Sequence, residues 1–114
     1  MSKPIKNLQL FNDLCEIEDT LIKRGWCKGS SVDFEGRVCM VGAAGIVCEI
    51  ISNGTVQNFP VKQAEARFGA ILDALGAAIG RKTERVPITM FNDLPRTTFD
   101  DVLRTVREAR EALL

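Results

Sequence analysis

The sequence predicts a single α+β domain that is mainly helical, with about four helices and one or two short strands or a small hairpin. Three observations predict it. Apolar residues recur at helical spacing around residues 8–24, 60–80 and 98–113. Short stretches rich in β-forming residues, bounded by glycine, asparagine or proline, lie between these segments. A chain of 114 residues suits one domain with one core, so we assign residues 1–114 to it.

The first helix is expected over residues 8–24. Its apolar residues fall on one helical face and are Leu10, Leu14, Ile17, Leu21 and Ile22. Residues 23–25 (KRG) form a stop signal, because basic side chains favour the negative end of a helix and glycine tolerates the left-handed conformation. Trp26 is predicted to fold back on Leu21 or Ile22 at this end.

The middle of the chain is richer in turns. Residues 28–40 are predicted to form a small hairpin, with arms around residues 32–34 and 38–40. Residues 41–51 favour a buried helix whose small residues allow close packing, and a buried strand is the alternative. Residues 55–59 are expected to form a short edge strand after the turn at Ser52-Asn53-Gly54.

A second long helix is expected to start at Pro60, a favourable first-turn residue, and to end at Gly80. Its apolar stripe consists of Val61, Ala64, Phe68, Ile71, Leu72, Leu75 and Ile79. Residues 86–91 (VPITMF) are rich in β-forming residues but contain Pro87, which indicates an extended segment or an edge strand.

The last helix is expected over residues 98–113. Its apolar face consists of Phe99, Val102, Leu103, Val106, Ala109 and Leu113. Thr97 or Thr98 is predicted to cap it, because Asp100 or Asp101 follows three residues later in the pattern of a capping box.

Composition excludes several chemistries. Fifteen basic and fifteen acidic residues give a formal net charge of zero, which argues against a general nucleic-acid or membrane-surface binder. The chain has no histidine, so serine–histidine and cysteine–histidine pairs are absent and the commonest metal ligand is missing. Its four cysteines show no C-x-x-C or zinc spacing. We therefore predict no metal and no cofactor.

The pattern of apolar residues indicates a protein of the cytoplasm. The longest apolar run, residues 38–48, is too short to span a bilayer. The first residues lack the apolar core of a signal peptide. We therefore expect reduced and mostly buried thiols and no membrane partner.

The tetrapeptide FNDL occurs twice, at residues 11–14 and 91–94. The first copy lies in a predicted helix, with Asn12 and Asp13 expected to point to water, and we interpret it as an accident. The second copy ends the predicted extended segment. Asn92 and Asp93 are expected chiefly to shape the turn into the last helix by accepting hydrogen bonds from nearby backbone amides. The alternative is a polar site that they form beside Arg96.

Other motifs favour ordinary structural roles. GAAIGRKT, residues 76–83, resembles a phosphate loop but has the wrong spacing and follows a helix instead of a strand. Cys39 lacks a histidine base, so a packed structural cysteine is favoured over a nucleophile. The three arginines of the last helix alternate with acidic residues, which indicates a solvated, self-paired face; they are Arg104, Arg107 and Arg110.

A series of short motifs follows along the chain: Gly25-Trp26, Gly36-Arg37-Val38-Cys39, Gly42-Ala43, Asn92-Asp93, and Arg96-Thr97 with Val102. In this order they resemble a family of small bacterial and bacteriophage proteins known only as a domain of unknown function. That family's pattern favours Trp before Asn-Asp, where this chain has Phe91. The resemblance implies no established activity, substrate or cofactor. It implies that Trp26, Cys39 and Asn92-Asp93 come together in space, and it suggests a phage or prophage setting.

We expect a binding module that performs no catalysis and acts on a protein partner or a small ligand. In a phage setting the partner would be a host or defence component, by analogy only. The candidate binding residues are Trp26, Cys39, Asn92, Asp93 and Arg96. The alternative is a small enzyme with a polar site around Asn92, Asp93 and Arg96, and a DNA-binding protein is the third hypothesis.

Overall fold

The computed structural model describes residues 5–52, 55–56, 62–82 and 86–114. In this part of the chain there are five helices and one pair of short strands. The helices are α1 (Leu8–Arg24), α2 (Met40–Val47), α3 (Lys62–Lys82), α4 (Ile88–Asp93) and α5 (Phe99–Glu111), and the strands are β1 (Ile51–Ser52) and β2 (Thr55–Val56). The prediction of a mainly helical protein is confirmed.

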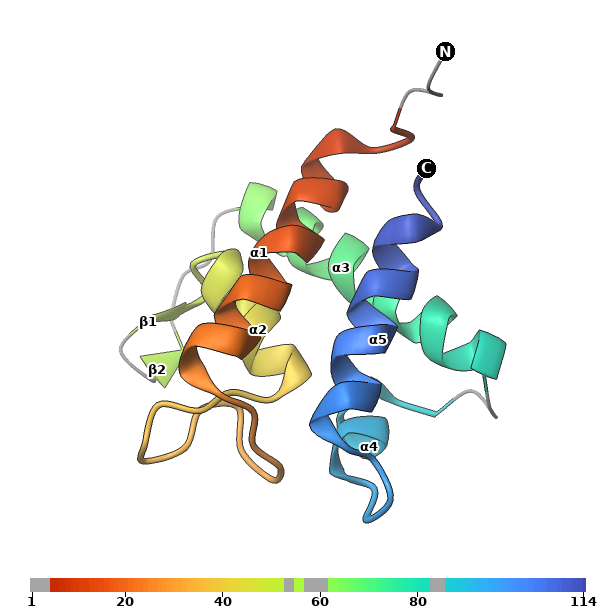
Figure 1. The fold of residues 1–114 in the computed structure, drawn as a ribbon. Coiled ribbons are helices and arrows are strands. Elements are labelled where there is room, and N and C mark those ends of the chain that lie inside the picture. Colours follow the sequence, from red (N-terminus) through yellow and green to blue (C-terminus); the bar gives the residue numbers. More distant parts are fainter. Residues whose placement is uncertain (1–4, 53–54, 57–61, 83–85) are drawn as a thin grey trace.

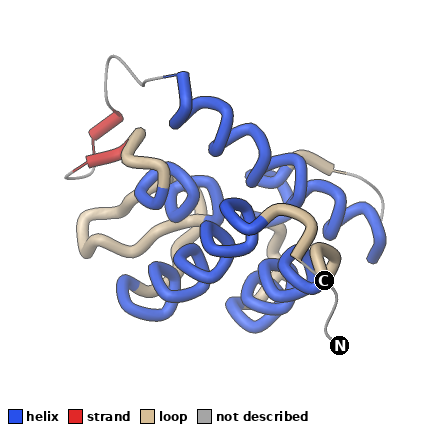
Figure 2. Tube along the Cα trace, turned by 90° about the horizontal axis from the view of Figure 1, so that it is seen from above, coloured by secondary structure: helices blue, strands red, loops and turns tan. Residues whose placement is uncertain are grey.

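The helices are arranged around α1 and α5, which lie side by side (Figure 1). Helix α2 packs on α1, and α3 packs on α5. Seen from above, α3 runs along one side of the molecule, with the two strands at one end (Figure 2). The long loop between α1 and α2 lies at the end of the molecule that is opposite the last turn of α5 (Figure 1). None of the described helices combines the length and apolarity needed to cross a membrane.

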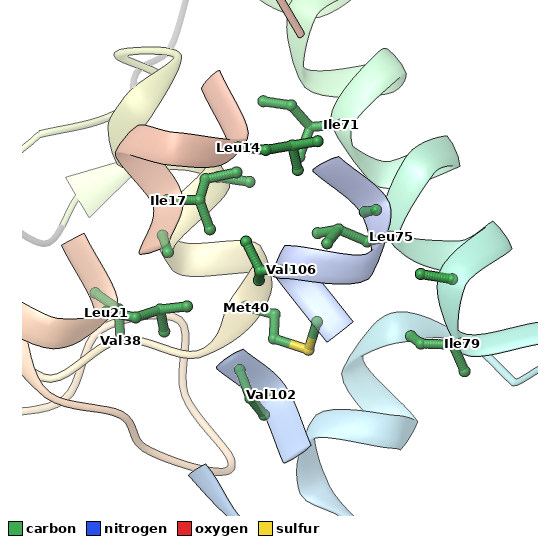
Figure 3. Packing of buried hydrophobic residues seen from close by; sticks show 14 of the residues in the cluster. Leu14, Ile17, Leu21, Val38, Met40, Ile71, Leu75, Ile79, Val102 and Val106 are labelled. Carbon is green, nitrogen blue, oxygen red and sulfur yellow. The ribbon is translucent and has the colours of Figure 1, made fainter. Parts of the chain in front are cut away.

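The core fills the space where α1, α2, α3 and α5 meet (Figure 3). Its fully buried large apolar side chains are Leu14, Ile17, Leu21, Val38, Met40, Ile71, Leu75, Ile79, Val102 and Val106. Helices α1, α3 and α5 each present one apolar stripe inward, as the helical spacing of their apolar residues predicts, whereas α2 contributes Met40 and a run of buried small residues.

Helix α1 has the predicted bounds. Asn7 caps its start by accepting a hydrogen bond from the Leu10 amide at 3.0 Å. Gly25, at φ 87°, ends it, and its amide donates to the Leu21 carbonyl. Ile22 is 55 % exposed, so its predicted place on the buried face is wrong.

Asp13 is buried, and the expectation that it points to water is also wrong. Its carboxylate is 2 % exposed and receives two hydrogen bonds from the guanidinium of Arg67 on α3, at 2.7 and 3.2 Å. A buried carboxylate needs such a partner because desolvation otherwise disfavours its charged form. No local pattern in α1 indicates that a cation on α3 would face this position.

The residues predicted as a buried helix over 41–51 do form one, but α2 ends at Val47. Ile51 pairs with Val56 in the antiparallel β1–β2 pair. The prediction that the small residues pack closely is confirmed. A Cβ atom at Gly42 would lie 1.9 Å from the Ser31 carbonyl oxygen, and one at Gly45 would lie 2.6 Å from Ile51 Cδ1.

The hairpin predicted over residues 28–40 is not formed by strands. This loop makes only two isolated bridges, Trp26 with Val38 and Val32 with Val38, and Met40 already belongs to α2. Each predicted arm is too short to build a ladder, so the loop is held by turns and side-chain contacts instead. Of the edge strand predicted over 55–59, β2 holds Thr55–Val56, and the remainder lies outside the described residues.

Helix α3 matches the second long predicted helix, although it continues to Lys82 beyond Gly80. The predicted start at Pro60 lies outside the described residues. The buried residues of its predicted stripe are Ala64, Ile71, Leu75 and Ile79.

The extended segment predicted over residues 86–91 is wrong, because Ile88–Asp93 forms helix α4. Pro87 stands immediately before the first helical residue, where its missing N–H group removes no intrahelical hydrogen bond. Proline therefore marks the start of a helix here. Helix α5 begins with the predicted capping box, in which Thr98 and Asp101 bond each other's backbone amides.

Candidate functional site

Asn92 occupies the last turn of α4 and is fully buried. Its side-chain oxygen accepts hydrogen bonds from Trp26 Nε1 at 2.8 Å and from the Met40 amide at 3.1 Å. Its side-chain nitrogen donates to the Cys27 carbonyl at 3.1 Å and to Asp93 Oδ1 at 2.9 Å. An asparagine amide has two donors and two acceptor lone pairs, so all of its hydrogen-bonding capacity is used. We call these five residues the Asn92 hub.

The Asn92 hub joins three segments that are far apart in the sequence. Trp26 and Cys27 follow α1, Met40 starts α2, and Asn92 ends α4. Asn92 and Asp93 were expected to accept hydrogen bonds from backbone amides in the turn or in the first turn of the last helix. This is wrong, because their donors from outside the pair are Trp26, Met40 and Gly29. Thr98 and Asp101 cap α5, which leaves Asn92 to tie the loop of residues 25–39 to α4.

Trp26 is half-buried at the edge of the hub. Its ring stacks on Phe99 of α5, with ring centroids 6.0 Å apart and planes 10° apart. Lys28 Nζ lies 5.3 Å from the Trp26 ring centroid and donates to the Leu94 carbonyl. No sequence pattern indicated Phe99 as the stacking partner of Trp26. The contact fastens the loop to α5 as well as to α4.

Cys27 and Cys39 belong to the same loop, and both are buried. Cys39 caps α2: its sulfur accepts a hydrogen bond from the Gly42 amide, and its own amide donates to the Ser31 carbonyl. Burial raises the pKa of the Cys27 thiol, and the negative charge of Asp33 raises it further. All four cysteines of the chain are free. These contacts fit the predicted structural role of Cys39.

Asp93 is exposed and is held in place by the hub. Its Oδ1 atom accepts hydrogen bonds from the Gly29 amide at 3.0 Å and from Asn92 Nδ2. Its second carboxylate oxygen accepts no hydrogen bond from the described residues. The side chain is therefore oriented by one oxygen while the other oxygen remains available at the surface.

A depression of about 240 Å³ opens beside Asp93. Its lining residues are Gly29, Ser30, Ser31, Cys39, Thr89 and Asp93. Two backbone segments thus form the depression, the loop of residues 25–39 and helix α4. We call it the Cys39–Asp93 depression.

The structure brings together four of the five predicted site residues. Cys39 and Asp93 line the depression, and Asn92 and Trp26 support it through the hub. Arg96 is exposed and is not among the lining residues. The lining residues Gly29, Ser30, Ser31 and Thr89 were missed. The only signal was the small polar run KGSS, which by itself is typical of any loop.

Within the described residues, no cluster of three or more cysteine, aspartate or glutamate side chains could hold a metal ion. Searches against curated proteins and against solved structures both found no match. One family model matches residues 12–112, and its description is "Family of unknown function (DUF6197)". The expected relation to a family of unknown function is confirmed by this match.

Proposed function

The chain belongs to this family of unknown function, DUF6197, and we propose that it is a non-enzymatic binding module for a small polar ligand. The ligand would occupy the Cys39–Asp93 depression. Asp93 carries the proposal, because it presents an oriented carboxylate oxygen in a depression that is also lined by three hydroxyl-bearing residues, Ser30, Ser31 and Thr89. A carboxylate among hydroxyl groups suits a ligand that donates hydrogen bonds and carries positive charge, such as a small amine.

The size of the depression favours a small ligand. Pockets for drug-sized molecules enclose roughly 300–1,000 Å³, and the depression measures about 240 Å³. It therefore has room for a molecule the size of an amino alcohol, or for one side chain of a larger partner. Because Oδ1 is already engaged by Gly29 and Asn92, the carboxylate loses little rotational freedom when its other oxygen binds.

An enzyme at this position receives less support. The predicted constellation was Asn92, Asp93 and Arg96, yet the Asn92 amide is saturated by internal hydrogen bonds. Arg96 does not line the depression. Asp93 is left without either predicted helper, and a single exposed carboxylate is a weak basis for acid–base catalysis. The DNA-binding hypothesis predicts an excess of basic residues, and the net charge of zero does not support it.

The phage or prophage setting remains part of the proposal through the resemblance alone. In that setting a lysine side chain or a free amino terminus of a host or defence protein would present the same ammonium chemistry as a small amine. The binding residue would again be Asp93, so the same variant tests both sources.

Titration with ethanolamine, followed by amide NMR shifts, tests the proposal. We expect saturable shifts at Gly29, Ser30, Ser31 and Thr89, and an apparent affinity at least about tenfold weaker in Asp93→Asn. The asparagine keeps an oxygen for the Gly29 amide while it removes the charge. The matched control is Asp19→Asn, an exposed carboxylate on α1. Glycerol and acetate serve as uncharged and anionic probes, and equal shifts with all three probes, or none with ethanolamine, would refute the proposal.

A further inference from the structure

Two of the four free cysteines, Cys27 and Cys39, occupy neighbouring positions although they are far apart in the chain. The loop between α1 and α2 places three short extended segments side by side, with Val38 in the middle one. Val38 forms a parallel bridge with Trp26 and an antiparallel bridge with Val32. Cys27 and Cys39 each follow one member of the parallel bridge, so they face each other across adjacent segments.

Backbone hydrogen bonds around Val38 fix this register. The Val38 amide donates to the Gly25 carbonyl, and the Cys27 amide donates to the Val38 carbonyl, each at 2.9 Å. Neighbouring strands lie roughly 5 Å apart, and the Cα atoms of a disulfide lie about 4.4–6.8 Å apart. Side chains at the same register of adjacent strands also point to the same face. The register therefore gives Cys27 and Cys39 the spacing and the direction that a disulfide needs.

The contacts of the two thiols agree with this placement. Cys27 Sγ lies 3.4 Å from the Ser30 carbonyl oxygen and 3.4 Å from that of Arg37, to which its hydrogen can be donated. Ser30 and Cys39 line the same depression. Burial raises the pKa of the Cys27 thiol most, and the charges of Asp33 and then of Cys39 add to this rise. The two sulfur atoms are therefore close enough to influence each other.

The two thiols differ in how a small molecule can reach them. Cys39 lines the Cys39–Asp93 depression, so a molecule that enters the depression meets the Cys39 side chain. Cys27 is buried and is not part of the lining. Redox-sensing cysteines commonly pair one thiol that the oxidant reaches with a second thiol that resolves the product. Cys39 has the place of the first thiol and Cys27 that of the second.

We propose that Cys27 and Cys39 are a redox-active pair that a small disulfide, RSSR, converts to an intramolecular disulfide. The Cys39 thiolate attacks one sulfur of RSSR, which forms a mixed disulfide and releases RS⁻. The Cys27 thiolate then attacks the Cys39 sulfur and releases a second RS⁻. Two electrons pass from the protein thiols to RSSR, and the two thiol protons convert the released RS⁻ ions to RSH.

Oxidation changes the wall of the depression. The disulfide removes the hydrogen that Cys27 Sγ directs at the Ser30 carbonyl, and Ser30 belongs to the lining. It also draws the Cys39 sulfur, which accepts from the Gly42 amide at 3.3 Å, toward Cys27. The thiol state is thereby coupled to the shape of the depression. The inference does not require that the depression bind an amine.

Incubation of the reduced protein with 2-hydroxyethyl disulfide tests this inference with an uncharged probe. Peptide mass mapping under denaturing conditions is expected to find Cys27 linked to Cys39 within one chain, without attached probe, and dithiothreitol should restore both thiols. Cys15→Ser is the matched control, because it removes the one cysteine of the chain that is not buried. This variant should still form the link, and its count of free thiols should fall by two.

Two single variants separate the two steps. Cys27→Ser should stop at the mixed disulfide and keep half of the probe on Cys39, whereas Cys39→Ser should leave Cys27 unmodified over the same time. A parent protein in which Cys27 and Cys39 stay reduced overturns the inference, and so does a link to another cysteine instead. Modification of Cys27 in Cys39→Ser as fast as in the parent also overturns it. The mapping of the parent protein remains decisive if either variant fails to fold.

Discussion

Both copies of FNDL begin inside a helix, yet a different polar residue is buried in each copy. In the first copy Asp13 is buried against Arg67 while Asn12 is exposed. In the second copy Asn92 is buried in the hub while Asp93 is exposed. The difference follows from what faces each helix. A guanidinium on α3 suits a carboxylate, whereas an indole N–H, a backbone amide and a backbone carbonyl together suit a carboxamide.

Replacing Asn92 should have the largest effect. Asn92→Ala leaves Trp26 Nε1, the Met40 amide and the Cys27 carbonyl without their partner, and buried unpaired groups are costly. We expect a loss of about 3–4 kcal/mol in the free energy of unfolding. Urea unfolding of this variant beside Asn12→Ala, which should lie within about 0.5 kcal/mol of the parent, measures the contrast. Equal losses in the two variants would remove the distinction between the copies.

Replacing Asp13 should have the next largest effect. Asp13→Ala removes a buried carboxylate and leaves Arg67 without its ion-pair partner. Breaking a fully buried pair costs about 3–5 kcal/mol, but the Arg67 side chain is 34 % exposed, so we expect about 2–3 kcal/mol. A double-mutant cycle with Arg67→Ala measures the coupling. If the two losses simply add, the ion pair does not explain why Asp13 is buried.

Glu18 lies one turn beyond the first FNDL on α1, and its carboxyl makes the stability of this part of the molecule depend on pH. Burial raises the pKa of the Glu18 carboxyl, but hydrogen bonds from Arg107 and Arg110 outweigh this, and the net pKa lies below 4.5. A lowered pKa in the folded state stabilises the fold above pH 4.5 and loses that stability as pH falls through the folded-state value. Glu18→Gln should therefore cost about 1 kcal/mol at neutral pH.

The same Glu18→Gln substitution should cost progressively less below pH 4.5. Melting curves of parent and variant across this range test the sign. Curves that diverge further as the pH falls would contradict the assignment of Glu18 to the arginines of α5. Arg104→Gln is a suitable control, because Arg104 pairs with Asp101 on the surface of α5 itself.

Replacing Asp93 should destabilise the protein much less than replacing its neighbour Asn92. Asp93→Ala removes the acceptor of the exposed Gly29 amide and one of the two acceptors of Asn92 Nδ2, which still reaches the Cys27 carbonyl. We expect a loss of about 0.5–1.5 kcal/mol, the net value of ordinary hydrogen bonds. Thermal unfolding of Asp93→Ala and Asn92→Ala, measured side by side, compares the loss of stability in the two variants. A loss as large as that of Asn92→Ala would show that Asp93, and not the buried amide, holds the loop.

Helical periodicity was sufficient to predict α1, α3 and α5, because their stability comes from apolar stripes that a local pattern records. It failed at α4, where VPITMF has β-forming composition but six residues become helical through tertiary contacts around Phe91 and Asn92. Local composition also could not assign partners to polar residues. Asn92 was identified as part of a motif, but its hydrogen-bond partners were not predicted. Three of them, Trp26, Cys27 and Met40, lie in other segments of the chain.

The sequence therefore indicated which residues lie near one another better than it indicated how they contact one another. Cys39 and Asp93 belong to the depression as expected from their place in the motif series. Arg96 was included because it follows Asp93 closely and belongs to the motif series, yet it lies three residues further along the chain and is not among the lining residues. Thr89 was missed because its segment was assigned to the wrong type of secondary structure.

The Asn92 hub also has a consequence that we expect for the order in which the molecule acquires its structure. Three of its four hydrogen bonds join residues 52 to 66 positions apart in the chain, whereas the capping bonds of α1 and α5 span three. Loop closure over such separations is slow compared with the formation of a helix. We therefore expect the depression to be assembled late in folding, after its helices exist. We also expect it to open and close as one cooperative unit, and exchange of the Met40 amide proton with solvent would measure how often it opens.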